Sequence, residues 1–237
     1  MRYFGVLSLA ALSILTGCNQ HAQQPTSNES EVTPTNLTED VLSQLTWMGQ
    51  PETVALTDQG LEVSVKRGTD FFNNPEDGTV VGTAPYLHTN MAGDFVATAL
   101  VQPDFSSQWN AVALMVYLDS LHWIKFGFEN SDATGPGIVS VVTKVTSDDA
   151  NGVVLNDLDR VWLSIVRKGN NYAMHWSSDG RNYKMARLTA MPLADSVKVG
   201  VEVQSPVGEM ARHRIIFFDV KKETAESLRD INKQENQ

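Results

Sequence analysis

The segment 122–129 carries side chains whose types and spacing could hold a sugar. Its residues alternate along a predicted strand, and one face is apolar, with Ile124, Phe126 and Phe128. The other face carries an aromatic ring, a glycine and two opposite charges, in the order Trp123, Lys125, Gly127 and Glu129. An indole offers a flat apolar surface to a sugar ring, while the charged pair offers donors and acceptors to its hydroxyl groups. The alternative is that Lys125 and Glu129 are solvated charges and that Trp123 covers an edge.

A second acid, Glu202, alternates with valines in the segment 197–204 and could share the open face with Glu129. Thr143 is a further candidate contact. If the strands of the two acids were neighbours, about 4.8 Å apart, their carboxyls could approach the roughly 5–5.5 Å of a retaining glycoside hydrolase. A nearby Lys125 would keep a carboxyl ionised, which is unsuited to a general acid. We therefore expect binding without catalysis, and keep a hydrolase or lyase using Glu129 and Glu202 as the alternative.

Other catalytic and metal-binding patterns are missing from the sequence. Its five histidines are scattered without metal-ligand spacing, and it contains no Gly-x-Ser-x-Gly or phosphate-binding loop. Two loops, residues 73–77 and 148–151, offer oxygen atoms suited to calcium but lack the spacing of a known calcium loop. We predict no metal and no cofactor, with calcium binding left open. The net charge of −10 disfavours nucleic acid as a partner.

Short segments of alternating polarity must position these side chains. The clearest are residues 95–101, 124–128, 161–165 and 197–203. Such alternation is typical of strands with one buried face. Turn signals separate the segments, and the pair Asp179-Gly180 is typical of a tight hairpin. About a dozen strands with no helix before residue 221 predict an antiparallel β-sandwich.

A series of short motifs spread over residues 45–220 points to one family. In chain order they are Trp47-x-Gly49-x-Pro51, Gly60-Leu61-x-Val63, Thr69-Asp70-Phe71-Phe72-x-x-Pro75, Gly93-Asp94-Phe95, Trp123-x-Lys125-x-Gly127-x-Glu129, Ser140-Val141-Val142-Thr143, Ser147-Asp148, Val161-Trp162-Leu163, Ser177-x-Asp179-Gly180 and Gly200 with Ser205-Pro206. The chain thereby resembles a bacterial and fungal family of concanavalin-A-like jelly-roll domains that includes the yeast "regulation of enolase" protein. The resemblance implies a sandwich of about 12–14 antiparallel strands, with a concave sheet that lectins and glucanases of this fold use for saccharides.

The chain also departs from this family at several positions. Residues 109–114 read Trp-Asn-Ala-Val-Ala-Leu where the family tends to have Tyr-Asp-Gln-Ala-Gly-Leu. Asp149 replaces a tryptophan, Ser164 an arginine and Tyr183 another tryptophan. Several of these changes remove polar or aromatic groups that a ligand could use. The resemblance therefore implies either an intact saccharide site or one that has drifted or specialised.

The N-terminus has the pattern of a targeting signal that ends at the only cysteine of the chain, Cys18. The alternative to a lipoprotein signal is an ordinary secretory signal with a chance cysteine. Arg2 precedes an apolar run, residues 4–15, which is followed by Thr16-Gly17-Cys18. A basic start, a short apolar stretch and small residues before a cleavage site describe a secretory signal. The position of the cysteine resembles the lipobox of bacterial lipoproteins, which implies lipidation of Cys18 with acyl chains such as palmitate. Because Asn19 follows in place of an aspartate, the resemblance favours an outer-membrane lipoprotein, on the periplasmic side or the cell surface.

Composition divides the rest of the chain. We expect a lipoprotein signal peptide at residues 1–17, a lipidated, disordered tether at 18–44, the β-sandwich domain at 45–220 and a charged C-terminal tail at 221–237 that could form a short helix. The expected partners are a saccharide or glycan and, through Cys18, the membrane. A structural lipoprotein that binds another envelope protein remains the third alternative.

Overall fold

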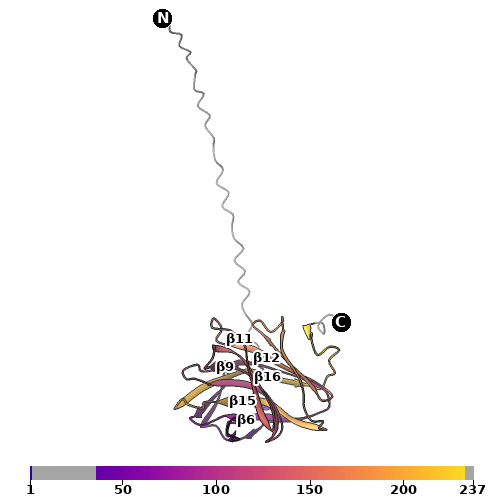
Figure 1. The fold of residues 1–237 in the computed structure, drawn as a ribbon. Coiled ribbons are helices and arrows are strands. Elements are labelled where there is room, and N and C mark those ends of the chain that lie inside the picture. The colour runs from indigo at the N-terminus through magenta and orange to yellow at the C-terminus, as the bar shows by residue number, and fades with distance from the viewer. Residues whose placement is uncertain (2–35, 233–237) are drawn as a thin grey trace. The chain divides into compact units, whose positions relative to one another are not determined.

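The computed structural model describes residue 1 and residues 36–232 (Figure 1). Apart from Met1, the predicted signal peptide lies outside the described residues, as do Cys18 and the predicted tether as far as residue 35. No helix in the part of the chain that is described has both the length and the apolar character needed to cross a bilayer.

Two antiparallel sheets of seven strands each form the domain. Sheet A contains, in spatial order, β1 (Thr46–Met48), β6 (Tyr86–Ala92), β15 (Ser196–Gln204), β8 (Ala111–Asp119), β9 (His122–Ser131), β10 (Gly135–Lys144) and β11 (Thr146–Val154). Sheet B contains β14 (Lys184–Ala190), β13 (Asn171–Ser177), β12 (Val161–Lys168), β7 (Phe95–Gln102), β16 (Met210–Lys221), β3 (Gly60–Lys66) and β2 (Thr53–Thr57). This architecture confirms the predicted all-β jelly-roll sandwich.

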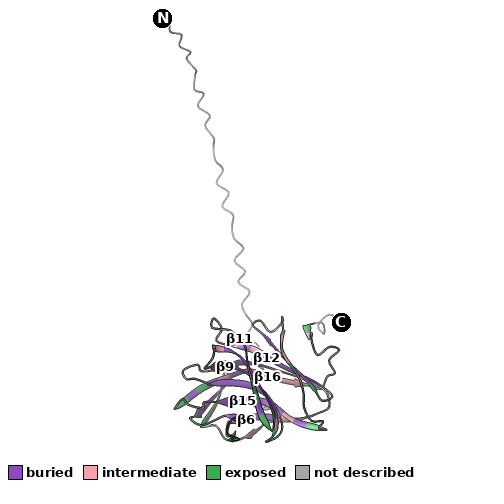
Figure 2. Ribbon diagram, in the orientation of Figure 1, coloured by how far each residue is buried: buried purple, intermediate pink, exposed green. Residues whose placement is uncertain are grey.

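The main hydrophobic core lies between the two sheets. The apolar row of β9, Ile124, Phe126 and Phe128, is fully buried in it, as the alternation predicted. The four alternating valines of β15 face the same core. Figure 2 shows the buried positions along the strands and the exposed ones mainly in loops and at strand ends. Since burying one such side chain contributes about 1.5–3 kcal/mol, this interior stabilises the sandwich.

A two-stranded ribbon, β4 (Phe71–Asn73) and β5 (Val80–Gly82), covers part of the outer face of sheet A. Its Phe71 packs edge-on against Trp123 of β9, with 5.9 Å between ring centroids. Both rings belong to a second hydrophobic cluster with Tyr86 and Met115. The open face expected from the sequence is therefore roofed at one end by a segment that lies some fifty residues upstream.

The predicted boundaries of the domain need correction at both ends. Residues 36–44 were expected in the tether, but they belong to the folded domain. The side chain of Asn36 exchanges hydrogen bonds with the backbone of Phe218 (2.8 and 3.1 Å). Leu37 is buried in the core, and a short helix, α1 (Glu39–Leu42), follows it. An apolar side chain at residue 37 and helix-capping by Thr38 explain why this segment folds onto the domain.

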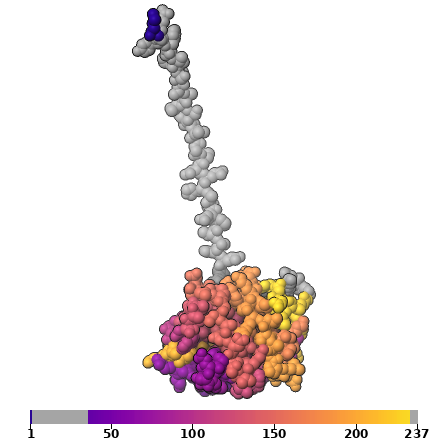
Figure 3. Space-filling model, in the orientation of Figure 1, coloured from indigo at the N-terminus to yellow at the C-terminus, as the bar shows by residue number. Residues whose placement is uncertain are grey.

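The charged tail could have formed a short helix, but residues 222–231 contain none. They run as an extended segment on sheet B, where Ala225 is fully buried and the carbonyl of Leu228 lies 3.0 Å from His175 Nε2. In Figure 3 this segment (yellow) lies directly against the orange part of the chain. Contacts with the sheet thus outweigh the weak helix propensity of the tail.

Candidate functional site

A cavity of about 610 Å³ opens on the outer face of sheet A, beside the ribbon. Its floor comes from β9, β10 and β11, and one wall is the segment that follows β4. Two residues of loops, Trp109 and Pro206, also line it. Besides these, the lining consists of Asp70, Phe72, Asn74, Pro75, Glu76, Lys125, Glu129, Asp132, Val139, Val141, Asp149 and Gln204. Of the five residues predicted to bind a ligand, this cavity includes two, Lys125 and Glu129.

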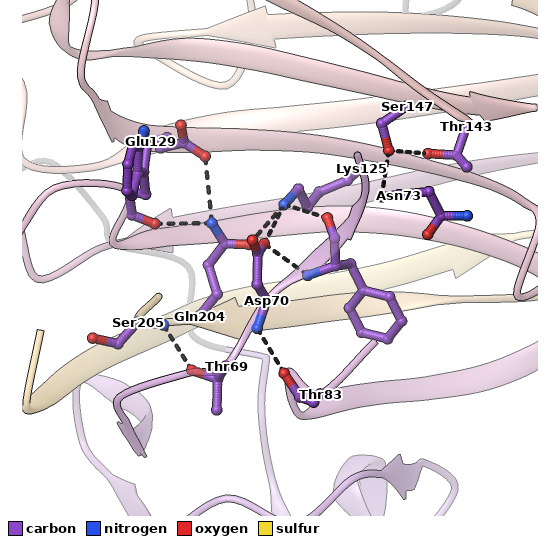
Figure 4. Close-up of polar contacts among 12 residues, drawn as sticks. Thr69, Asp70, Asn73, Thr83, Lys125, Glu129, Thr143, Ser147, Gln204 and Ser205 are labelled. Atoms are coloured by element: carbon purple, nitrogen blue, oxygen red, sulfur yellow. Dashed lines mark hydrogen bonds and ion pairs between the residues drawn. The ribbon is translucent and has the colours of Figure 1, made fainter. Parts of the chain in front are cut away.

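Lys125 joins the ribbon to sheet A. Its Nζ donates to Asp70 Oδ1 (3.0 Å), to the carbonyl of Phe71 (2.9 Å) and to Gln204 Oε1 (2.7 Å), as Figure 4 shows. Burial opposes the charged form, yet the nearby carboxylates, Asp70 first, raise the pKa of Lys125 above its usual value. All three protons of the ammonium group therefore have protein acceptors.

Gln204 connects this lysine to the opposite side of the cavity. Its Nε2 donates to the carbonyl of Trp109 (2.8 Å) and makes a long contact with Glu129 Oε2 (3.5 Å). The amide thus fixes two groups of the cavity wall with one side chain. Because its oxygen and nitrogen both have partners, its orientation is determined by the network.

Trp109 adopts a strained backbone conformation at the cavity. Its φ of 61° lies in the left-handed region, which a bulky residue seldom occupies. Its N–H donates to the carbonyl of Asn130 (2.8 Å), and its own carbonyl accepts from Gln204. Such a conformation costs on the order of 1–3 kcal/mol and is found mainly at functional sites, where the surroundings hold it in place. The half-buried side chain of Trp109 is therefore held in the cavity wall.

Glu129 is the buried acid of the cavity, with only 8% of its surface exposed. Burial raises its pKa to about 8, against the lowering effect of Lys125, and the carboxylates of Asp149, Asp70 and Asp132 raise it further. Its Oε1 forms no hydrogen bond with the described residues, while Oε2 has only the long contact with Gln204. This side chain is the most deeply buried of the five acids that line the cavity.

Trp123 and Thr143 do not contribute to the cavity, which corrects two of the predictions. Trp123 is 1% exposed because Phe71 of the ribbon covers it, so its indole cannot stack on a ligand. Thr143 is fully buried and bonded to Ser147 (2.8 Å), whose hydroxyl accepts from the backbone N–H of Asn73 in β4 (2.9 Å). Both residues support the ribbon.

Glu202 is also misplaced as a ligand contact. It points to the outer face of sheet A as predicted, but it is fully buried, and neither carboxyl oxygen has a hydrogen-bond partner in the described part of the chain. Burial raises its pKa to about 8. Strand β8 separates β15 from β9, so these two strands lie roughly 9.6 Å apart at about 4.8 Å per strand. Glu202 lies across β8 from Gly127, and Glu129 is two residues further along β9. The condition of neighbouring strands, on which the hydrolase alternative depended, is not met.

Several residues of the cavity were not predicted as contacts. Asp70 appeared in the sequence only as a member of a motif, and Gln204 only by its alternation with the valines of β15. Trp109 appeared only where the chain departs from the family pattern. Asp149 was considered with an acidic loop suited to calcium, yet no three acids or histidines among residues 36–232 are grouped to hold a metal ion. The useful signal was the tryptophan at position 109, which departs from the family pattern.

A second cavity, of about 410 Å³, lies on the outer face of sheet B. Trp162, Tyr183 and Phe217 line it, together with Asn232 of the C-terminal segment. Asn232 is bonded to the backbone of Tyr183 on both its N–H and carbonyl (2.8 and 2.9 Å). This cavity contains both acidic and basic side chains. Its half-buried Trp162 lies on the sheet opposite Trp109.

Residues 47–223 match a family model described as "Protein of unknown function (DUF1349)". The chain belongs to this family. It is 27% identical over 165 residues to "Regulation of enolase protein 1" of Saccharomyces cerevisiae, a match that covers 70% of this chain and 83% of the yeast protein. The resemblance seen in the motifs is thereby confirmed.

Solved structures show the same fold. A functionally unknown protein from Saccharomyces cerevisiae superposes with a TM-score of 0.72 at 24% identity, covering 78% of this chain and 99% of that one. A mutant of the GH43 protein BlXynB from Bacillus licheniformis gives 0.59 at 11% identity, with 80% of this chain and 38% of that chain covered. The exoplasmic domain of VIP36, in a form bound to Ca²⁺ and Man3GlcNAc, gives 0.50 at 11% identity over 78% of this chain and 86% of that one.

Proposed function

We propose that this member of the family binds a saccharide or glycan, without catalysis, in the cavity on sheet A. The observation that carries the proposal is the composition of that cavity. Trp109 and Phe72 supply apolar rings, while Glu129, Asp149 and Asn74 supply oxygen atoms around them. Sugars present an apolar ring face and a rim of hydroxyl donors, so this combination matches their chemistry.

The fold adds support of a general kind. Jelly-roll domains include the VIP36 domain, whose solved form contains Man3GlcNAc. Fold alone does not establish function, so the argument depends on the cavity itself. Because the cavity is open to solvent and has few donors, we expect weak binding, with a Kd near a millimolar, or about −4 kcal/mol.

We further propose that the domain is anchored to the bacterial cell envelope through lipid on Cys18, as an outer-membrane lipoprotein. Two acyl chains would attach it firmly, because each buried CH₂ group contributes about 0.8 kcal/mol. Metabolic labelling with an alkyne-bearing fatty acid should mark the full chain and fail to mark Cys18→Ala. Equal labelling of both proteins would contradict the anchor but not the saccharide site.

Saccharide binding is tested with variants of one tryptophan on each sheet. We expect Trp109→Ala to lose at least about tenfold in affinity, since stacking on an aromatic ring is worth about 1–3 kcal/mol. Calorimetric titration of the full chain with ligands found on a panel of envelope and plant polysaccharides gives the measurement. The matched control, Trp162→Ala, removes a half-buried tryptophan of sheet B and should leave binding unchanged. Loss of binding in the control alone would contradict the proposed site.

A further inference from the structure

The loop of residues 103–110 connects β7 to β8 and places Trp109 in the wall of the cavity on sheet A. The loop contains no helix or strand, so its backbone groups need partners on neighbouring elements. Its Trp109 has a φ of 61°, in the left-handed region of backbone conformation. A loop with such a residue keeps one conformation only where its surroundings hold it. The contacts between this loop and the strands beside it therefore decide where the indole ring lies.

One residue of β9, Asn130, makes four hydrogen bonds to the loop. Its side-chain Nδ2 donates to the carbonyls of Phe105 (3.2 Å) and Ser107 (3.1 Å). Its backbone carbonyl accepts from the N–H of Trp109 (2.8 Å), and its backbone N–H donates to the carbonyl of Asn110 (3.0 Å). Asn130 thus bonds the loop at Trp109 itself and on both sides of it.

The side-chain amide of Asn130 is the part of these contacts that depends on the type of residue. The backbone bonds are open to any amino acid at position 130 except proline, whereas the other two need a side chain with two donor protons. An asparagine amide has two such protons, which matches the two carbonyls that it contacts. Asn130 does not line the cavity itself. Its influence on a ligand must therefore pass through the loop.

The two ends of the loop have other anchors. The N–H of Asp104 donates to Nδ1 of His213 in β16 (3.2 Å), and the buried Asn110 donates from Nδ2 to the carbonyl of Asp104 (2.9 Å). Between these ends, the side chains of Asn130 and Gln204 bond the backbone of the loop. Loss of the Asn130 amide should therefore loosen the middle of the loop and leave its ends in place.

We propose that Asn130 is a positioning residue of the saccharide site, because its side chain keeps Trp109 in the conformation that meets the ligand. Without the amide, the loop would occupy this conformation for only part of the time. The apparent Kd then rises in inverse proportion to the fraction of the protein that is ready to bind. This inference rests on the proposed function, since it names a residue that prepares the same site.

Hydrogen exchange in the ligand-free protein tests the effect on the loop. In Asn130→Ala we expect the backbone N–H of Trp109 to exchange at least about tenfold faster than in the parent, while the core strands keep their protection. Asn130→Asp keeps the shape of the side chain without its two donors and should give the same result. The control Asn171→Ala changes an exposed asparagine at the start of β13 and should leave exchange at Trp109 unchanged.

Binding shows whether this conformation matters to the ligand. By NMR titration of the full chain with an oligosaccharide that binds the parent, Asn130→Ala should raise the Kd about tenfold, or about 1.4 kcal/mol. Asn171→Ala should bind as the parent does. In a Trp109→Ala background, Asn130→Ala should change the Kd by less than about twofold, because the amide acts through the indole. Thermal melting establishes that each variant is folded.

The outcomes separate this inference from the proposed function. Faster exchange at Trp109 with an unchanged Kd would overturn the inference and leave the saccharide site. A loss of affinity that persists in full in the Trp109→Ala background would also overturn it, since Asn130 would then act by another route. If the parent binds no member of the polysaccharide panel, the proposed function fails and the inference fails with it.

Discussion

The ammonium group of Lys125 joins the β4–β5 ribbon to sheet A through hydrogen bonds to Asp70, to the Phe71 carbonyl and to Gln204. Alternation along β9 correctly predicted that Lys125 and Glu129 share the outer face of sheet A. Alternation could not show that Asp70 and the Phe71 carbonyl, on another strand, would take up the protons of the lysine. Such contacts join segments that are far apart in the sequence and form only when the chain folds. The spacing of residues within one strand therefore cannot reveal them.

Replacing Lys125 therefore tests its role as the connection between ribbon and sheet. Lys125→Met should lower the free energy of unfolding by about 3–5 kcal/mol, because the variant leaves buried acceptors and a carboxylate unpaired. Urea unfolding measures the change. Lys144→Met, at an exposed position at the end of β10, should change stability by less than about 0.5 kcal/mol. Equal stability of the two variants would contradict the assignment.

Glu202 provides a second test at the level of a residue. Its pKa is about 8 in the folded protein, against a usual value of 4.5, because the carboxyl is buried. Between these values the unfolded chain has released the proton and the folded chain retains it. The contribution of Glu202 to the free energy of unfolding therefore falls as the pH rises from about 4.5 to 8, and above pH 8 it stays constant.

Glu202→Gln removes the titration while keeping the shape of the side chain. At pH 8 we expect the variant to be more stable than the parent by an amount on the order of 3–5 kcal/mol, and at pH 5 by less than about 1 kcal/mol. Urea unfolding across this pH range gives the measurement. Glu129 shows the same direction of pKa change, so part of the slope should remain. In the control Glu209→Gln, which changes an exposed residue, the free energy of unfolding should depend on pH as it does in the parent protein. If Glu202→Gln showed that same pH dependence, Glu202 would not be a buried, protonated carboxyl.

Among the elements, the β4–β5 ribbon decides which side chains of sheet A remain accessible. The strands and their inward rows could be predicted, because period-two alternation follows directly from strand geometry. The ribbon comprises two strands of three residues each, and its pattern is too short to reveal that it lies over β9. For this reason Trp123 appeared open in the sequence while Trp109, in a loop, lines the cavity.

Removing the ring of Phe71 tests how firmly the ribbon is held. Phe71→Ala should destabilise the protein by about 3–5 kcal/mol, since it leaves a void above Trp123. Thermal or urea unfolding checks this value. Val80→Ala, on the exposed side of β5, serves as the control and should cost under about 0.5 kcal/mol. A small effect of Phe71→Ala would mean that the ribbon contributes little and that Trp123 is accessible after all.

At the scale of the whole molecule, composition and motifs were enough to predict the sandwich and the family. The boundaries were harder, because residues 36–44 and 222–231 have the polar composition of linkers. A few specific contacts hold them on the domain, such as the hydrogen bonds of Asn36 and the burial of Ala225. The amino-acid composition of a segment does not report single contacts of this kind, so it could not predict that these segments are part of the domain.

The central claim, that the cavity on sheet A holds a saccharide, is tested most directly by NMR titration of the indole N–H groups. The chain has five tryptophans, so each signal can be assigned with single Trp→Phe variants. We predict that an added oligosaccharide shifts the Trp109 signal in a saturable way and leaves those of Trp123 and Trp162 in place. A saturable shift at Trp162 with none at Trp109 would contradict the account.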